Sequence, residues 1–522
     1  MNTPSTNPTL LDRYVTLRAL HWLVQPARLR IYVAVVVILA TLIGAFYAFE
    51  NWRGKRAWVR MQRELQAAGQ WAELEQLAPP PVPDAQNFAM TPLLAPLFDF
   101  VPGTQTQRDT NANAQARLVE GVLSSASSKW AGWPLAQMTD WSQVLQSKHT
   151  SNRVAVTPAD VLEALRPAET KLAELRAASA RPAARFHLRY DLENPAGILL
   201  PHLAVLNGYS RALSVRGSAL LAVGRPDEAL ADVELGFYLI DTLRAEPMLI
   251  SHLVRSAMIR RMLQPVWEGL AQERWNTNHL ARLQTRLDQY RFLADGQEAL
   301  KGERAWGNQI IAWARRNPGV VSQLGSAEET PARVLFPYAL LPRGWFYLEQ
   351  VEYNRLFNLS LGPAINEGRG WILPAELEAA TRRLEEAVEL GAGSLWKHQQ
   401  LASMLLPALG RAVVKSALAQ ASTDLATVAC ALEQHRLALG QYPESLDALV
   451  PRFLDQVPRD VIQGGALRYQ TLPEGRFILY SLGWNGTDDS GHPGGKPNGA
   501  WEGNAGDWVW RYPAGLNAVP AR

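Results

Sequence analysis

The chain has 522 residues, of which 47% are hydrophobic and 19% are charged, and its net charge is +3. This length exceeds what one hydrophobic core usually serves, so we expect two or more folded regions. The small positive charge argues against a nucleic-acid partner, because proteins that bind nucleic acid gather a strongly basic face. The single cysteine, Cys430, excludes an intrachain disulfide framework and a multi-cysteine metal site.

An apolar run at 31–49 is the first element that the sequence predicts, and only Thr41 and Gly44 interrupt it. At about 1.5 Å per residue a helix over this run is roughly 28 Å long, close to the hydrocarbon thickness of a bilayer. The bulky residues Phe46 and Phe49 do not suit the end of a cleaved signal peptide. We therefore expect an uncleaved transmembrane helix at 31–49 that contacts the lipid bilayer.

The residues at 50–154 are expected to link this helix to the folded part of the chain. Asn51–Leu77 is predicted to be a helical stalk, whose basic residues either contact lipid headgroups or are solvated. Pro79–Pro83 consists almost entirely of proline and predicts an extended, semi-rigid spacer. From Asn87 to Thr150 no helical or strand period is sustained, so we expect mostly irregular structure.

A helical domain is predicted at 155–410. Its first helix should begin after Thr157, because Thr157 and Asp160 form a capping-box pattern and Pro158 suits the first helical position. Helical periodicity predicts helices at the following ranges: Pro158–Ala180, Leu203–Val223, Pro226–Leu243, Leu249–Leu270, His279–Ala314 and Pro374–Leu390. Several prolines in Asn317–Trp345 predict a long crossing loop.

One predicted hairpin, Arg216–Leu230, resembles a single tetratricopeptide repeat. Gly217 and Ala229 supply the small residues at which the two helices of such a repeat touch. Neither neighbouring stretch repeats this pattern at the ~34-residue period that a tetratricopeptide array requires. Because stacked repeats stabilise one another, a single match favours an ordinary helical hairpin.

The pattern changes at 411–522. A heptad-like stripe from Leu418 to Leu439 predicts a long helix that Gly440 ends. Strands are then predicted at Ala466–Leu472, Arg476–Leu482 and Asp507–Tyr512. The expected fold is therefore mainly α, with a membrane-anchored domain of antiparallel helical hairpins followed by a small α+β domain containing three or four antiparallel strands.

Tyr442-Pro443 and the run from Leu479 to Gly491 resemble the globular domain of the major pseudopilins of type II secretion systems, the general secretion pathway protein G-like family. The resemblance covers 411–522 and implies a domain on the periplasmic side of a bacterial inner membrane. Pseudopilins also carry a leader glycine and a glutamate early in the apolar helix. Leu29-Arg30-Ile31 matches neither, so we do not expect processing by prepilin peptidase or assembly into a pseudopilus.

The resemblance also implies a calcium site, because the family binds calcium through the loop after its last hairpin. The candidate ligands in this chain are Asn485, Asp488, Asp489 and Asp507. Calcium favours several hard oxygen ligands, which clustered aspartates and a flexible loop can supply. In the alternative interpretation, these residues make turns and their side chains accept hydrogen bonds from the backbone.

The tryptophans of this region also have two interpretations, core packing of a small sheet or stacking against sugars or a partner, of which core packing is favoured. They are Trp484, Trp501, Trp508 and Trp510.

The sequence contains neither His-Glu-x-x-His nor Gly-x-Ser-x-Gly, and its histidines lack the spacing of metal ligands. His202 and His252 lie on predicted helices and are interpreted as packed side chains. The favoured function is a non-enzymatic scaffold or binding protein that is anchored in the inner membrane, faces the periplasm and binds envelope or secretion proteins. The alternative is an envelope hydrolase or a carbohydrate-binding protein, which a deep polar pocket within 155–410 would favour.

The direction of the membrane crossing depends on the resemblance. Basic residues flank the apolar run on both sides, so the positive-inside comparison is close to a tie. They are Arg13, Arg18, Arg28 and Arg30 before the run, and Arg53, Lys55, Arg56, Arg60 and Arg63 after it. With the pseudopilin-like domain in the periplasm, the segment 1–30 is expected in the cytoplasm.

Overall fold

The computed structural model describes residues 26–71, 73–102, 104–117, 122–124, 135, 138, 140–146, 155–190, 194–319, 338–362, 370–388, 397–406, 409–472, 475–494 and 505–512. Three parts of the sequence-based predictions lie outside these residues: most of the segment 1–30, the middle of the Asn317–Trp345 loop, and Trp501.

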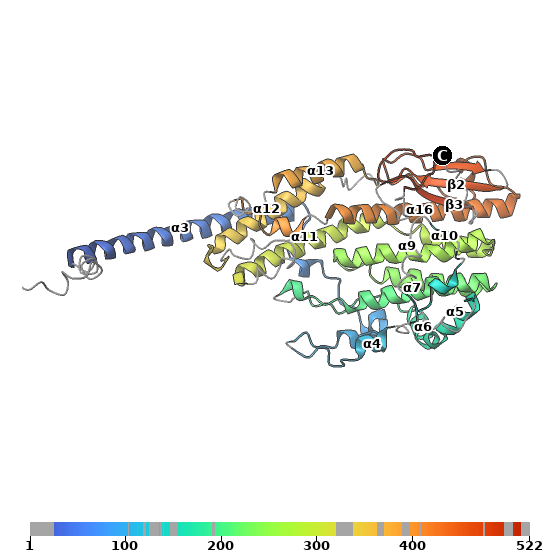
Figure 1. Cartoon of the computed structure of the whole chain (residues 1–522), viewed down its shortest axis with the longest axis horizontal. Helices are drawn as coiled ribbons and strands as arrows, with labels where there is room; N and C mark the ends of the chain where they lie inside the picture. The colour runs from blue at the N-terminus through green and yellow to red at the C-terminus, as the bar shows by residue number, and fades with distance from the viewer. Residues whose placement is uncertain are drawn as a thin grey trace, which may run out of the picture.

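The described chain is mainly helical with one small antiparallel sheet, as expected, and a long helix projects from its body (Figure 1). The helices are α3 (Pro26–Ala67), α4 (Ala112–Ala116), α5 (Pro158–Leu165), α6 (Glu169–Ala178), α7 (Pro201–Ala222), α8 (Pro226–Asp241), α9 (Leu249–Ala271), α10 (Thr277–Leu287), α11 (Phe292–Arg316), α12 (Arg343–Leu361), α13 (Pro374–Ala387), α15 (Ala402–Leu405) and α16 (Leu409–Leu439). The strands are β1 (Arg468–Leu472), β2 (Arg476–Ser481) and β3 (Trp508–Tyr512).

The projecting helix α3 runs without a break for 42 residues and contains the apolar run. It ends at Ala67, so the prediction of helix as far as Leu77 is wrong at that end. Gly69, with a φ of +66°, supplies the left-handed conformation that commonly ends helices. Two stretches, Arg30–Ala67 and Ala402–Leu439, are long and apolar enough to cross a membrane by length and composition. The apolar window of Arg30–Ala67 is not buried at all by the body. The apolar window of Ala402–Leu439 is 56% buried, and this stretch consists largely of the core helix α16.

The inner half of α3 packs along α12 and is not a free stalk. Gly54, Trp58 and Leu65 are buried on one face, at spacings that follow the helical period. At the crossing, a Cβ on Gly54 would lie 2.1 Å from the carbonyl oxygen of Gly344. Only a glycine allows the two backbones to approach this closely.

The first predicted helical boundary is confirmed. Thr157 Oγ1 accepts a hydrogen bond from the Asp160 amide at 3.3 Å, and the Asp160 carboxylate accepts one from the Thr157 amide at 2.9 Å. The continuous helix predicted over Pro158–Ala180 is wrong, because α5 and α6 are separated by a short 3₁₀ turn that contains Pro167. Proline cannot donate the backbone hydrogen bond that a continuous helix needs there.

The single helix predicted over His279–Ala314 is also wrong, because α10 ends at Leu287 and α11 begins at Phe292. The rings of Tyr290 and Phe292 stack with their centroids 5.4 Å apart, and both are buried. Residues two apart on a continuous helix point in opposite directions, so this stacking requires a break.

Helix α12 was not predicted. Polar side chains interrupt its buried face: Glu349 and Asn354 are fully buried and Gln350 is 3% exposed, so the apolar period that marks a helix is weakened. Asn308 of α11 and Asn354 exchange side-chain hydrogen bonds across the seam at 2.8 and 3.3 Å. Arg304 Nη2 donates to Asn358 Oδ1 at 2.6 Å, which shows that α11 and α12 run antiparallel.

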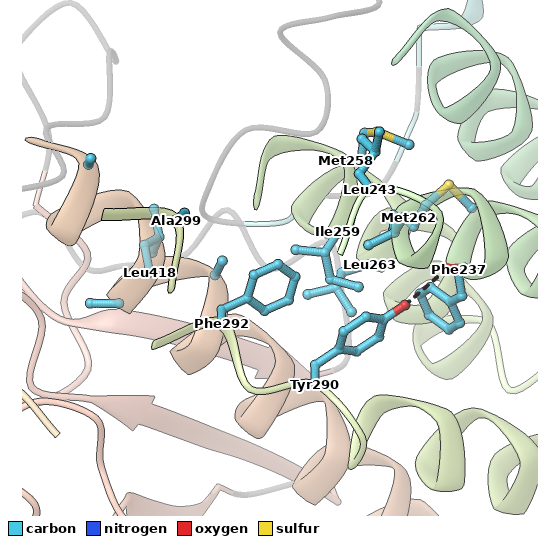
Figure 2. Packing of buried hydrophobic residues seen from close by; sticks show 14 of the residues in the cluster. Phe237, Leu243, Met258, Ile259, Met262, Leu263, Tyr290, Phe292, Ala299 and Leu418 are labelled. Atoms are coloured by element: carbon cyan, nitrogen blue, oxygen red, sulfur yellow. Dashed lines mark hydrogen bonds between the residues drawn. The ribbon is translucent and has the colours of Figure 1, made fainter. Parts of the chain in front are cut away.

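Helix α16 is the central element of the body. It contacts α9, α10 and α11, and also β2 and β3. Figure 2 shows the part of the core where Ile259 of α9, Phe292 of α11 and Leu418 of α16 meet. One hydrophobic cluster extends from Leu74 to Trp510, so packing is continuous across the predicted boundary between 155–410 and 411–522.

The sheet has the order β1-β2-β3, with Leu479 of β2 opposite Tyr469 on one side and Trp510 on the other. This agrees with the prediction of three or four antiparallel strands. Trp484, Trp508 and Trp510 are buried in the core, so they pack the sheet and present no surface for stacking.

Candidate functional site

A cavity of about 680 Å³, lined by both apolar and charged side chains, lies between the start of α9, the start of α11 and the proline-rich segment. Pro79 and Pro80 form part of its wall, and Arg185 Nε donates a hydrogen bond to the Pro79 carbonyl at 2.9 Å. The segment Pro79–Pro83, expected to be a spacer, is therefore packed against the body. It is extended as expected where it begins and ends, with φ −59° and ψ 134° at Ala78 and φ −58° and ψ 136° at Pro83.

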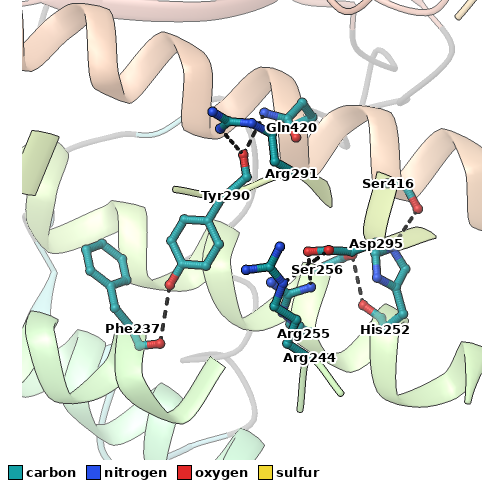
Figure 3. Close-up of polar contacts among 10 residues, drawn as sticks. All are labelled: Phe237, Arg244, His252, Arg255, Ser256, Tyr290, Arg291, Asp295, Ser416 and Gln420. Atoms are coloured by element: carbon teal, nitrogen blue, oxygen red, sulfur yellow. Dashed lines mark hydrogen bonds and ion pairs between the residues drawn. The ribbon is translucent and has the colours of Figure 1, made fainter. Parts of the chain in front are cut away.

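An ion-pair cluster is located at one side of this cavity (Figure 3). Asp295, in the first turn of α11, accepts hydrogen bonds from Arg255 Nη1 at 2.6 Å and from Arg244 Nε at 3.2 Å. Arg255 is only 1% exposed, and its guanidinium lies 4.9 Å from the ring centre of Phe292. This placement over an aromatic face offsets part of the cost of burying the cation.

Arg255 retains unused donors. Within the described part of the chain, its Nε and Nη2 are buried and have no hydrogen-bond partner. Buried donors without partners are costly, and they normally indicate a bound water or ligand group. A carboxylate or phosphate oxygen would satisfy both nitrogens through the planar guanidinium fork.

His252 also lines the cavity, and its Nε2 lies 2.8 Å from Ser416 Oγ. Burial lowers the pKa of His252 to about 4, with a smaller contribution from the charge of Arg255, so the imidazole is neutral at neutral pH. Gly296 of α11 makes room for this contact, because a Cβ there would lie 3.0 Å from Ser416 Oγ and 3.1 Å from His252 Nε2.

The pair of Ser416 and His252 is arranged differently from a nucleophile and its base. Ser416 Oγ donates to the Ala412 carbonyl at 3.0 Å. A hydroxyl has one hydrogen, so while this bond is formed Ser416 can only accept from His252 Nε2. The imidazole then carries its proton on Nε2 and cannot remove the proton of the serine.

A second buried histidine lies behind the cavity wall. His202 Nε2 is 2.7 Å from Glu246 Oε1, and the imidazole stacks on Phe186 with a centroid distance of 4.2 Å. Ser251 Oγ donates to the other oxygen of Glu246. Both His202 and His252 are thus packed side chains, as interpreted from the sequence.

The cavity contains charged side chains within a largely apolar lining, and its acidic groups are occupied. Asp295 is held by two arginines, and Glu246 by His202 and Ser251. Ser251, Glu246 and His202 are hydrogen-bonded in one line, but the carboxylate lies between the hydroxyl and the imidazole, so His202 does not contact the serine as a base would. The arrangement is suited to binding a small polar molecule, with the unpaired nitrogens of Arg255 as its anchor.

The predicted calcium ligands lie outside this cavity, between β2 and β3. Asp488 accepts hydrogen bonds from Arg468 Nε and Tyr480 Oη, both at 3.0 Å. Asp489 Oδ2 accepts from Asn485 Nδ2 at 2.7 Å. Asp488 and Asp489 therefore both have internal partners, which supports the turn interpretation for these two residues.

Asp507 differs from the other carboxylates because it is fully buried. Its Oδ2 accepts from the Gly491 amide at 2.7 Å, whereas Oδ1 has no hydrogen-bond partner among the described residues. Burial, with smaller contributions from the charges of Asp489 and Asp488, raises the pKa of Asp507 to about 6.

The four predicted ligands fit calcium only in part. Asp507 offers a free oxygen next to a negative loop, but no group of three acidic, histidine or cysteine side chains in the described chain is arranged to hold a metal ion.

Sequence reasoning missed the structural role of Asp460. Its carboxylate is buried and accepts from Ser481 Oγ at 2.6 Å and from the amides of Leu482 and Ile462 at 2.9 Å each. No neighbouring residue signals this role, because its partners lie in the strand end and the loop on either side of the hairpin. Asp460 therefore ties the segment before β1 to the end of β2.

Comparisons of the chain with family models, curated proteins and solved structures found no match, so its function is argued from the geometry described above.

Proposed function

We propose that this chain is a bacterial inner-membrane protein with a single transmembrane helix, whose body faces the periplasm and binds envelope or secretion proteins. The observation that supports this proposal is the division of α3 into two halves. The apolar window of α3 is free of the body, whereas the following turns are packed into it at Gly54. A helix that serves only as a surface element of a soluble body would leave this apolar window facing water, at a large hydrophobic cost.

The orientation follows from the resemblance of 411–522 to pseudopilin domains, which face the periplasm. A reporter enzyme that is active only in the periplasm should therefore be active when it is fused at Arg522. Activity of a reporter restricted to the cytoplasm at the same position would contradict the orientation. Extraction of the protein by sodium carbonate without detergent would contradict the membrane anchor itself.

We propose a second role for the body, which is to bind a small anionic or zwitterionic molecule in the cavity lined by Arg255. In the alternative function, a carbohydrate-binding protein or an envelope hydrolase, the same cavity would hold the ligand or the substrate. Inorganic phosphate and acetate are suitable probes, because each presents oxygens to the guanidinium fork of Arg255. Calorimetric titration of the full chain should show saturable binding of at least one probe.

Arg255→Met should abolish this binding, and Arg255→Lys should weaken it because a lysine lacks the planar fork. Arg282→Met is the matched control, since Arg282 pairs with Glu234 on the surface at 2.5 Å. Thermal unfolding of each variant verifies that it is folded. Equal affinity in the parent chain and a folded Arg255→Lys variant would contradict a role of Arg255 in binding.

We also propose that the loop after β2 binds calcium, with Asp507 and Asp489 as its main ligands and Asn485 and Asp488 beside them. A divalent cation would satisfy the free oxygen of Asp507 and relieve the repulsion from the neighbouring carboxylates. The full chain is the right sample, because α16 shares its core with both regions.

At a hundredfold excess of calcium over its dissociation constant, binding should stabilise the native state by about 2.7 kcal/mol. The shift in unfolding midpoint between calcium and chelator should disappear in the double variant Asp488→Ala, Asp489→Ala. An identical midpoint of the parent chain in both conditions would leave only the turn interpretation.

A further inference from the structure

We infer that the end of the body from which α3 emerges lies in the interface of the bilayer, with Leu340 inserted among the lipids and Arg343 and Arg316 at the headgroup phosphates. This inference rests on the proposed membrane anchor and adds a second, separate contact with the membrane. It involves α12 and the preceding turn Tyr338–Leu340, which are nearly three hundred residues away from the apolar run in the sequence.

The first observation is a contact between this turn and the apolar run itself. Tyr47 lies within 31–49, and its hydroxyl donates a hydrogen bond to the Leu340 carbonyl. The Leu340 side chain is 67% exposed, the largest exposure among the exposed large hydrophobic residues of the described chain. An exposed leucine is ordinary in water, but this one is located at the level of a helix that we assign to the membrane.

The depth of this contact follows from helix geometry. Tyr47 lies two residues inside the predicted end of the span, which corresponds to about 3 Å along the helix axis. The interface of each leaflet extends roughly 5–7 Å beyond the hydrocarbon. If α3 crosses the membrane at 31–49, Leu340 reaches the boundary between hydrocarbon and headgroups.

Aromatic and basic side chains surround this level on α3. Trp52 is 58% exposed, and the guanidinium of Arg56 lies 5.5 Å from its ring centre. Tryptophan and arginine next to each other are typical of residues at the membrane interface.

Two further arginines come from other helices. Arg343 begins α12 and is exposed. Because α11 and α12 are antiparallel, the C-terminal end of α11 meets the start of α12, and Arg315 accordingly stacks on Tyr347 at 4.4 Å. The next residue, Arg316, is exposed and lines a pocket together with Lys55 of α3. Arg343 and Arg316 complement the phosphates of an anionic lipid surface.

The crossing of α3 and α12 holds the body at this depth. The Gly344 amide donates to Asn51 Oδ1 at 2.6 Å, and a Cβ on Gly344 would lie 2.0 Å from the Glu50 carbonyl oxygen. No flexible linker separates the membrane helix from the body. The body therefore cannot move away from the bilayer unless this crossing opens.

The test measures depth with an environment-sensitive fluorophore on an introduced cysteine of the full chain. The native Cys430 is fully buried, and the labelled parent chain provides the blank. The labelled variants are Ile38→Cys in the apolar run, Leu340→Cys at the proposed contact, and Leu439→Cys at the far end of α16. Leu439 is 54% exposed and is the matched control for Leu340. Vesicles contain phosphatidylcholine and phosphatidylglycerol with a quencher attached to lipid chains at a shallow or a deep position.

We expect deep quenching at Ile38, and shallow quenching at Leu340 at least threefold above the small background signal at Leu439. Equal signals at Leu340 and Leu439 with quenching at Ile38 would overturn this inference and leave the anchor intact. Absence of quenching at Ile38 would instead overturn the anchor.

A second measurement addresses the phosphate contacts. Charge reversal by Arg343→Glu with Arg316→Glu should reduce the shallow quenching at Leu340 by half or more. Reversal of Arg274 and Arg452, two exposed arginines elsewhere, should leave it unchanged. Full quenching at Leu340 after reversal of Arg343 and Arg316 would overturn the role given to these arginines.

Discussion

The two long helices, α3 and α16, are held in place by opposite kinds of contact. Helix α3 meets α12 through backbone, at Gly54 and Gly344, where there is no room for any side chain. The last turns of α16 are held by polar side chains: Glu433 accepts from Tyr442 Oη at 2.7 Å and pairs with Arg436 at 2.5 Å.

The difference between these contacts indicates how each one fails. A contact between glycines is lost when volume is added, and it does not respond to protons. The polar contacts near the sheet tolerate added volume at exposed positions, but they depend on each hydrogen bond and on the charge of buried carboxylates.

The largest effect is expected from Gly344→Ala. The new Cβ would meet backbone atoms of Glu50 and Asn51 at 2.0 and 2.6 Å, which cannot move without separating α3 from α12. We expect a loss of unfolding free energy of about 3 kcal/mol, at the upper end of overpacking substitutions. Denaturant unfolding in detergent measures it.

Gly208→Ala is the matched control, because no atom lies within 4 Å of a Cβ at this position of α7. Here alanine should stabilise the chain by roughly 0.5–1 kcal/mol through its helix propensity. If both alanine variants were as stable as the parent, the close approach of α3 and α12 would be refuted.

A somewhat smaller effect is expected from Asp460→Ala. The change leaves the buried amides of Leu482 and Ile462 without an acceptor, each at a cost of about 1–3 kcal/mol before relaxation. We expect a net loss of about 2 kcal/mol by chemical unfolding. Asp455→Ala, at an exposed aspartate nearby, should change stability by less than about 0.5 kcal/mol. Similar effects of the two substitutions would show that the Asp460 hydrogen bonds contribute little.

The smallest effect concerns the pH dependence at Asp507. Its pKa is raised from an ordinary value of 3.8 to about 6, so the folded state holds this proton more tightly than the unfolded state. The protonated Asp507 therefore stabilises the folded state fully below about pH 4, and this stabilisation is lost as the pH rises through about 6. Asp507→Asn keeps an acceptor for Gly491 but removes the charge.

In the presence of chelator, Asp507→Asn should be more stable than the parent by about 1 kcal/mol at pH 7.5 and equally stable at pH 4. Asp488, Asp489 and His492 also lie in this loop, so the difference between variant and parent isolates the contribution of Asp507. A difference that is independent of pH would contradict the buried, titrating carboxylate.

Elements marked by neighbouring residues were predictable from the sequence. The capping box at Thr157, the alternation of Arg476–Ser481 and the aromatic strand Trp508–Tyr512 all depend on residues within a few positions of one another, and the structure has each of them. The candidate site was predictable only as a set of residue types. Asp488 and Asp489 are acidic and lie in a loop as expected, but their pairing with Arg468 and Asn485 has no local signal.

By itself, the sequence determined the mainly helical class, the small antiparallel sheet and the apolar run, because periodicity and capping act over a few residues. Only the tertiary structure decided the break between Tyr290 and Phe292, the cavity around Arg255, and the crossing at Gly54 and Gly344. These features depend on which surfaces of distant helices fit together. Such a fit is a property of volume and hydrogen bonding in the assembled core, and no stretch of sequence contains both partners.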